Sequence, residues 1–495
     1  MTDRPTVHTA RGPVVGRRAG DVLRFAGIPF ARPRRFRPPE DVRPWREPRD
    51  AGGFGPDAPQ PAGSSLDGLV GAPTRPWDED DCLTVNVWTP AADAGRRPVL
   101  VWLHGGGFLS GSGSEPWYDG TRTAAAHDVV LVTLNYRLGV FGFLRLAGLL
   151  DGDHAASGNT GLLDQLAGLR WVRDNVEAFG GDPGNVTLFG QSAGASSAAA
   201  LLAAPDARGL FAKVVIQSGG VLEPNGAEEA ESVADRFLRS AGLDRSTAAE
   251  LLTAPAEQVL RRQAAFCATT MPDKLGGQLF KPVVDGDLLP TGLLDAVRAG
   301  RTAAVPLVVG ANRDDARTAT GVGPPRPVLE HVVGALLTGL GHPVRETLAD
   351  YAAPGRDPLV DVMTDWVFHR PATELADAHA RAGGAVWAYR FDWCPDPAER
   401  PLGACHSMEL PFVFDALDHL GATDLYGSAP PRHLARRVNG AWARFARTGD
   451  PDPGAWPRYG EDRVTMVFDD ESRAVADPNG AAHGRLWRVA VGGDR

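Results

Sequence analysis

Short apolar runs alternate with longer amphipathic stretches along the chain from residue 98 onwards. The runs are rich in β-branched residues and end at glycine or polar residues, which is typical of strands buried in a mostly parallel sheet. Apolar residues recur at helical spacing at 161–179, and residues 193–204 are small and alanine-rich, so both stretches are predicted as helices. This alternation predicts the α/β class, with helices on both faces of the sheet. The predicted strands are 99–103, 129–134, 186–189, 214–216, 306–309 and 386–391.

The segments before and between the predicted strands have a different composition and periodicity. Residues 1–80 are rich in proline and arginine and carry turn signals, which predicts short strands and long loops. Residues 224–300 and 318–385 show helical patterns that interrupt the sheet. The chain of 495 residues is long enough for several average domains or for one large α/β domain. We predict one domain over residues 1–495, with insertions around 224–300 and 318–385.

Composition and charge narrow the classes of partner. Hydrophobic residues make up 43% and charged residues 23%, which are ordinary values for a soluble globular enzyme. The net charge of −10 argues against nucleic acid and anionic membrane as partners, because phosphate binding needs clustered lysine and arginine. We expect neither a secretory signal, since the N-terminus lacks an apolar region, nor a membrane-spanning helix. The four cysteines are unpatterned, which predicts no metal site, no disulfide framework and a cytoplasmic location.

The G-x-S-x-G pattern of the chain lies at residues 190–194, with Ser192 at its centre. The pattern alone is a weak signal in a chain with 59 glycines. It gains weight because a predicted strand precedes it and a predicted helix follows it, which is the strand–turn–helix of a nucleophile elbow. Such a turn would project the Ser192 hydroxyl above the sheet and aim the helix N-terminus at a developing oxyanion. The alternative is a Gly-Ser turn that only caps a helix.

A glycine-rich loop at residues 104–107 follows the predicted strand at 99–103. Lipases and esterases use an HGGG loop of this kind, because glycine lets backbone N–H groups point at a carbonyl oxygen. We predict that Gly106, Gly107 and Ala193 supply the N–H groups of an oxyanion hole, and that His104 orients the loop. The alternative is a flexible glycine loop.

A nucleophilic serine needs a base and an acid beside it. Both are expected after Ser192, because folds with a nucleophile elbow carry the catalytic triad in the chain order serine, acid, histidine. Position favours His406 as the base, since it follows the predicted strand at 386–391 after a proline-rich loop. His483 is the weaker alternative. Several aspartates are candidates for the acid, and each is equally compatible with a solvated turn residue. They are Asp285, Asp287, Asp314 and Asp315.

Motifs along nearly the whole chain resemble those of type-B carboxylesterases, the family that includes bacterial para-nitrobenzyl esterases and cholinesterases. The resemblance implies the α/β-hydrolase fold, with helical insertions that form a substrate gorge. It also implies that the small-molecule ester substrate is hydrolysed without a cofactor or metal. The motifs are FAGIPF at 25–30, EDDCLTVNVW at 79–88, NYRLGVFGFL at 135–144, GNTGLLDQ at 158–165 and FGGDPGNVTLFGQSAGA at 179–195.

The resemblance also selects among the candidate residues. Residues 406–414 are similar to the family's H-G-x-E-L-x-F-V-F motif, which implies that His406 is the base. Residues 314–316 are similar to its D-E-G motif, which implies that Asp315 is the acid. Together with Ser192 they imply a serine esterase that works through an acyl-enzyme. We expect neutral esters of short to medium acyl chains as substrates, including aryl and benzyl esters.

This chain departs from the family pattern at three positions. Asp315 stands where the family usually has glutamate, so either the loop must move in or the hydrogen bond to His406 must lengthen. Gln191 replaces the usual glutamate before the serine, which removes a negative charge that would attract a cationic ligand such as choline. Ala58 stands where secreted members carry the cysteine that pairs with the equivalent of Cys82, which supports the predicted cytoplasmic location.

The substrate pocket is less defined by the resemblance. Phe280 aligns with an acyl-pocket aromatic of cholinesterases, and structural packing is an equal alternative for it; Gln191 is the other candidate contact to substrate. The aromatic that stacks on choline is not evident, since Ala72 falls near its place and Trp77 lies further along. The competing functional hypotheses are a non-hydrolytic binding protein, a scavenger that is acylated without turnover, and hydrolysis of amides, carbamates or lactones.

Overall fold

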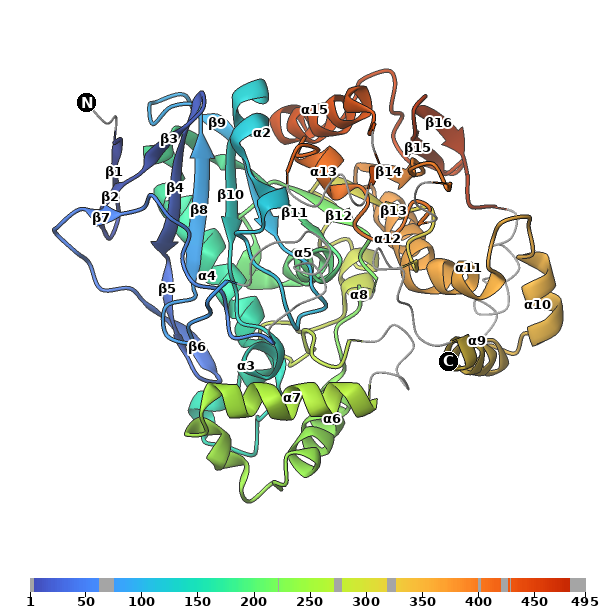
Figure 1. The fold of residues 1–495 in the computed structure, drawn as a ribbon, viewed down its shortest axis with the longest axis horizontal. Coiled ribbons are helices and arrows are strands. Elements are labelled where there is room, and N and C mark those ends of the chain that lie inside the picture. Colours follow the sequence, from blue (N-terminus) through green and yellow to red (C-terminus); the bar gives the residue numbers. More distant parts are fainter. Residues whose placement is uncertain are drawn as a thin grey trace.

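The computed structural model describes residues 4–61, 75–220, 222–270, 278–317, 326–398, 402–419, 426–427 and 429–480. Within these residues the main sheet has 11 strands, in the order β16-β15-β14-β13-β12-β11-β9-β10-β8-β4-β3 (Figure 1). The central strands from β10 to β15 pair in parallel, and antiparallel strands flank them on both sides. The predicted α/β class with a mostly parallel sheet is therefore confirmed.

The six predicted runs coincide, within a few residues at their ends, with β9 to β14 of the main sheet. The strands of this sheet are β3 (Arg17–Ala19), β4 (Val22–Pro29), β8 (Thr84–Thr89), β9 (Arg97–Leu103), β10 (Val130–Leu134), β11 (Gly181–Gln191), β12 (Lys213–Gln217), β13 (Leu307–Asn312), β14 (Val386–Phe391), β15 (Val464–Phe468) and β16 (Arg473–Ala476). The N-terminal region adds β1 (Thr6–Thr9), β2 (Gly12–Val15), β5 (Ala31–Arg34), β6 (Arg37–Asp41) and β7 (Arg49–Asp50), which form two small sheets.

The main sheet separates two apolar cores, because successive side chains of a strand point to opposite faces. In β9, Val99, Val101 and Leu103 belong to one core. Leu100 and Trp102 belong to the other. Both faces of the strand are covered, which explains why β9 reads as a continuous apolar run rather than as an alternating one.

Helices cover the two faces of the sheet. The face of the first core carries α4 (Thr160–Asn175) and α5 (Ala193–Ala203), and the opposite face carries α2 (Thr121–His127), α13 (Leu410–Val413) and α15 (Arg432–Thr448). α3 (Gly139–Phe143) precedes α4. The predicted helix at 161–179 ends earlier than expected, because a short 3-10 turn replaces its last residues before Gly180 takes up a φ of 81°. None of the helices in the described part of the chain is long and apolar enough to cross a bilayer.

Two groups of helices lie between sheet strands. α6 (Ala227–Ser240), α7 (Ala256–Thr270) and α8 (Leu293–Arg298) follow β12, and α9 (Arg326–Gly339), α10 (Val344–Asp350), α11 (Pro358–Thr364) and α12 (Arg370–Arg381) follow β13. α8 and α12 pack against each other, and α12 also packs on β13 and β14, so it belongs to the layer that covers the sheet. α9, α10 and α11 lie at the edge of the molecule (Figure 1) and enclose an apolar cluster of their own. That the whole chain forms one domain stays a prediction.

Candidate active site

Ser192 lies in the sharp turn between β11 and α5. Its backbone has φ 57° and ψ −124°, a conformation that is strained for a residue with a side chain. Its N–H donates a hydrogen bond of 3.0 Å to the carbonyl of Gln217 at the end of β12. A Cβ atom at Gly190 would lie 2.5 Å from the backbone of Gly194, and one at Gly194 would lie 2.0 Å from the carbonyl oxygen of Leu103. The turn therefore needs glycine on both sides of the serine, as a nucleophile elbow requires.

The loop after β9 lies directly against the serine turn. A Cβ atom at Gly105 would lie 3.1 Å from the Cβ atom of Ser192. Gly106 and Gly107 have φ values of 113° and 63°, which residues other than glycine rarely adopt. Among the described residues, the N–H groups of Gly106, Gly107 and Ala193 have no hydrogen-bond acceptor. Two of these donors lie in the loop beside Ser192 and the third follows it in the chain, and all three are left without a partner within the described residues.

His104, the first residue of this loop, packs between the loop and Tyr136. Its ring is buried and stacks on that of Tyr136, with 4.3 Å between the ring centroids. The Tyr136 hydroxyl donates to the His104 carbonyl at 2.7 Å, and the His104 Nδ1 atom lies 2.8 Å from the carbonyl oxygen of Gly105. Burial lowers the pKa of His104 to about 4, so the ring is neutral at neutral pH. A neutral ring fixed between the loop and Tyr136 is suited to orienting the loop.

His406 and Asp315 come together from the loops that follow β14 and β13. The Nδ1 atom of His406 lies 2.7 Å from Oδ1 of Asp315, whose other oxygen accepts the N–H of Asn312 at 2.8 Å. Asp315 reaches His406 at full hydrogen-bonding distance, so the bond has not lengthened. Burial opposes the charged form of His406, but the hydrogen bond and the charge of Asp315 outweigh it and raise the pKa of His406.

Gln191 contacts the other nitrogen of the His406 ring. Its Nε2 atom lies 3.2 Å from His406 Nε2 and donates to the Ser407 hydroxyl at 3.1 Å. Because the Nδ1 proton goes to Asp315, Nε2 carries a lone pair that the Gln191 amide can donate to. Within the described residues no hydrogen bond joins the Ser192 hydroxyl to His406, and in enzymes without substrate such bonds are often long. In this resting arrangement the Gln191 amide occupies the lone pair that a base needs.

Glu409 is a second buried carboxyl group beside the site, and the sequence argument gave it no role. One oxygen accepts the amide of Asn312 at 2.7 Å and the other accepts that of Gln217 at 3.4 Å. Burial and the nearby charge of Asp315 raise the pKa of Glu409 to about 7. Its place in the motif at 406–414, three residues after the histidine, was the available signal.

Two phenylalanines differ in their contact with the site: Phe280 packs among other aromatic rings, whereas Phe368 lies beside His406. Phe280 is buried, and its ring packs against Phe237 and Phe266 at 6.2 and 6.1 Å between centroids. The packing alternative therefore has direct support, and contact between Phe280 and substrate stays a prediction. The ring of Phe368 lies 5.1 Å from the ring of His406, although the sequence did not single it out.

The other candidates for the acid, the base or the choline contact have different partners or lie outside the described residues. Asp285 accepts the N–H groups of Asp287 and Leu289 at 3.0 Å and the Asn159 amide at 2.7 Å, so its carboxylate is used by a turn. Asp314 turns away from His406 and pairs with arginines. His483 and Ala72 lie outside the described residues.

Comparisons with known proteins agree over nearly the whole chain. The model of the carboxylesterase family matches residues 3–330 and 345–487. A para-nitrobenzyl esterase of Bacillus subtilis (strain 168) is 38% identical over 493 residues, which cover 97% of this chain and 98% of that protein. A phenmedipham hydrolase of Pseudarthrobacter oxydans is 36% identical over 498 residues, with 96% and 97% covered. The solved structure of a thermophilic PNB esterase superimposes with a TM-score of 0.86 at 38% identity, covering 98% of this chain and 100% of that one.

Proposed function

The chain belongs to the carboxylesterase family, and from this premise we propose that it hydrolyses carboxylic esters with Ser192, His406 and Asp315 as its catalytic triad. The observation that carries the proposal is the 2.7 Å hydrogen bond between His406 and Asp315, formed beside the strained turn of Ser192. Small-molecule esters are the substrates that the family implies.

Each member of the proposed triad has a separate task. The Ser192 hydroxyl attacks the ester carbonyl while His406 Nε2 takes its proton. Asp315 keeps the other ring proton on Nδ1 and stabilises the imidazolium that forms. His406 then protonates the departing alcohol, and water hydrolyses the acyl-enzyme by the same route.

The developing oxyanion is held by backbone N–H groups of Gly106, Gly107 and Ala193. These groups have no acceptor among the described residues, so they are free to bind the oxygen. Glycine at 106 and 107 supports this role because the loop has φ values of 113° and 63° there, which side-chain-bearing residues rarely adopt. One such donor contributes about 3 kcal/mol to lowering the barrier.

We propose neutral esters of short to medium acyl chains, including aryl and benzyl esters, as the preferred substrates. The neutral carboxamide of Gln191 next to the nucleophile supports this preference, since it offers no charge to a cationic alcohol group. Phe368 beside His406 adds an apolar surface. The cytoplasm is the proposed location, because Ala58 leaves Cys82 without the disulfide partner of secreted relatives and all four cysteines are free thiols.

Hydrolysis of p-nitrophenyl acetate, butyrate and octanoate by the wild type and by Ser192→Ala tests the proposal. The wild type is expected to turn over, and the variant to lose at least about a thousandfold in kcat/KM. Ser196→Ala is the matched control, because among the described residues this hydroxyl in α5 bonds to the backbone carbonyl of Ser192 and to no side chain. A burst without steady turnover would indicate a scavenger, and no reaction at all would contradict the triad.

A further inference from the structure

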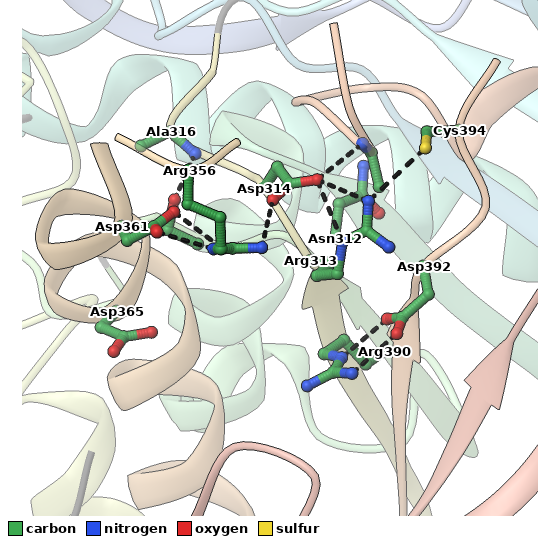
Figure 2. Close-up of polar contacts among 12 residues, drawn as sticks. Asn312, Arg313, Asp314, Ala316, Arg356, Asp361, Asp365, Arg390, Asp392 and Cys394 are labelled. Atoms are coloured by element: carbon green, nitrogen blue, oxygen red, sulfur yellow. Dashed lines mark hydrogen bonds and ion pairs between the residues drawn. The ribbon is translucent and has the colours of Figure 1, made fainter. Parts of the chain in front are cut away.

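Asp314 precedes Asp315 in the chain but serves a different set of partners. Figure 2 shows its carboxylate between the guanidinium groups of Arg313 and Arg356. One oxygen lies 2.9 Å from Nη2 of Arg313 and the other lies 3.1 Å from Nη1 of Arg356. Burial opposes its ionisation, but the charges of Arg313 and Arg356 and its hydrogen bonds outweigh this and lower the pKa of Asp314. Asp314 is therefore a buried, ionised group that never touches the histidine.

The same carboxylate holds the loop that carries His406. Oδ2 of Asp314 accepts the N–H of Ala404 at 3.0 Å, and the N–H of Asp314 donates to the carbonyl of Ala404 at 3.0 Å. This approach is close: Gly403 has φ 65°, and a Cβ atom there would lie 2.6 Å from Oδ2 of Asp314. Two further bonds join the loops, from Asn312 Nδ2 to the carbonyl of Cys405 and from the His406 N–H to the carbonyl of Arg317.

Arg356 extends this connection to the helices α9 to α11. It forms two bonds of 2.7 Å to the carboxylate of Asp361 in α11, while its third nitrogen reaches Asp314 (Figure 2). The N–H of Ala316 also donates to the Thr364 hydroxyl at the end of α11, at 3.0 Å. Bidentate arginine–carboxylate pairs fix orientation as well as distance. The loop with the proposed acid is thus tied on one side to the histidine loop and on the other to α11.

We propose that Asp314 is a positioning residue, which together with Arg356 sets the separation of the acid loop from the histidine loop. The inference rests on the proposed triad. The resemblance implies glutamate where this chain has Asp315, and the missing methylene shortens the side chain by about 1.5 Å. A bond of 2.7 Å to His406 then requires the two loops to lie closer, and the paired contacts of Asp314 with Ala404 hold them there.

Asp314→Asn tests the role of the charge with little change in volume. The amide replaces one carboxylate oxygen by a donor, so either Arg356 loses its partner or Ala404 and Arg313 lose theirs together. We expect kcat for p-nitrophenyl butyrate to fall about 10- to 100-fold, because misplacing a catalytic group by an ångström has effects of this size. KM is expected to stay within about twofold, since Asp314 is not placed to touch substrate. Rates are expressed per active site titrated with diethyl p-nitrophenyl phosphate, so that misfolded protein is not counted.

A double-mutant cycle with Asp315→Glu separates positioning from general stability. The longer acid is too long for loops held close, so we expect Asp315→Glu alone to lower kcat. When Asp314→Asn lets the loops separate, the longer acid can bridge the gap. The fold loss of kcat in the double variant is therefore expected to be at least about tenfold smaller than the product of the two single-variant losses. Losses that multiply would overturn the proposal, because a merely structural Asp314 has no reason to sense the length of the acid.

Two arginine variants in the helices α9 to α11 and their connecting loops test whether the link from Arg356 to Asp314 matters for kcat. Arg356→Ala should lower kcat in the same direction by a smaller factor, since Arg313 still neutralises Asp314. Arg326→Ala is the matched control: Arg326 lies in the same group of helices and pairs with Asp357 and Glu330, and within the described residues no contact joins it to either catalytic loop. It is expected to leave kcat unchanged. An equal loss in Arg326→Ala would overturn the proposal.

The low-field proton NMR signal of His406 Nδ1–H reports the bond to Asp315 without any substrate. We expect Asp314→Asn to shift or broaden this signal and Arg326→Ala to preserve it. If the wild type hydrolyses esters and Asp314→Asn keeps its full kcat, the positioning role is wrong and the proposed function stands. If the wild type hydrolyses none, the proposed function is wrong, and an unchanged NMR signal in Asp314→Asn would still refute the positioning role.

Discussion

Replacing Gln191 by glutamate is expected to raise the pKa of His406 and to move the acid limb of the pH–rate profile to higher pH. The amide nitrogen of Gln191 lies 3.2 Å from His406 Nε2, and the side chain is 2% exposed. In the wild type the amide donates to the neutral ring and so favours it. A carboxylate in its place accepts a hydrogen bond from the protonated ring and favours the charged form.

The size of the effect follows from this distance. Opposite unit charges 3.2 Å apart attract by about 5 kcal/mol at an effective dielectric constant of about 20. Desolvation of the new carboxylate offsets much of this attraction. Opposite charges at such distances typically leave a net shift of one pH unit or more, which corresponds to about 1.4 kcal/mol per unit. Since only the neutral ring acts as a base, kcat/KM on the acid limb should fall about tenfold for each unit.

The assay is the pH dependence of kcat/KM for p-nitrophenyl butyrate, measured for the wild type, Gln191→Glu and Gln60→Glu. Gln60 is a buried glutamine whose side chain bonds to the backbone of Gly111, so the same chemical change is made away from His406. We expect the acid limb to move up only in Gln191→Glu. The variant should also gain on a cationic ester relative to its neutral isostere, and since position 191 is buried this gain should depend little on salt. An acid limb that stays in place or moves down in folded Gln191→Glu would refute this account of the site.

Substitutions at three other positions should change the pH profile, kcat and the stability, respectively. Glu409 raises the pKa of His406 as far as it is ionised, and its own pKa is about 7, so Glu409→Gln should move the acid limb of the pH–rate profile only slightly, to lower pH. Gly106→Ala places a Cβ atom 2.0 Å from the carbonyl of Ser110, so kcat should fall about 100-fold or more while thermal unfolding shows a folded protein. Arg137→Ala leaves the buried carboxylate of Asp164 unpaired, and denaturant titration should show about 3–5 kcal/mol lower stability.

The sequence predicted the parts of the site that depend on local geometry. The elbow at Ser192 and the loop at 104–107 could be located because a sharp turn and a close backbone approach both require glycine. The central strands could be located because a strand covered on both faces is apolar throughout. Position favoured His406 over His483 without excluding the latter, since both follow strand-like stretches, and the resemblance to a family was needed to select His406.

The sequence could not predict contacts that form between distant segments. Nothing near Gln191 indicates that its amide reaches His406, because the two lie far apart in the chain. The pairing of Asp314 with Arg356 depends in the same way on how α11 docks beside β13. The position of α12 was also open, since an amphipathic helix has the same pattern whether it covers the sheet or lies in an insertion.

The helices α9 to α11 have an apolar cluster of their own, and polar contacts from Arg356 and Thr364 join them to the catalytic loops. The cluster is separate from the two cores of the sheet, but α11 runs on through residues 365–369 into α12, which packs on β13 and β14. A displacement of α11 would therefore be transmitted to the acid loop through Arg356 and Thr364 and to the sheet through α12, so substitutions in this cluster should change the alignment of the catalytic loops even though they lie far from the serine.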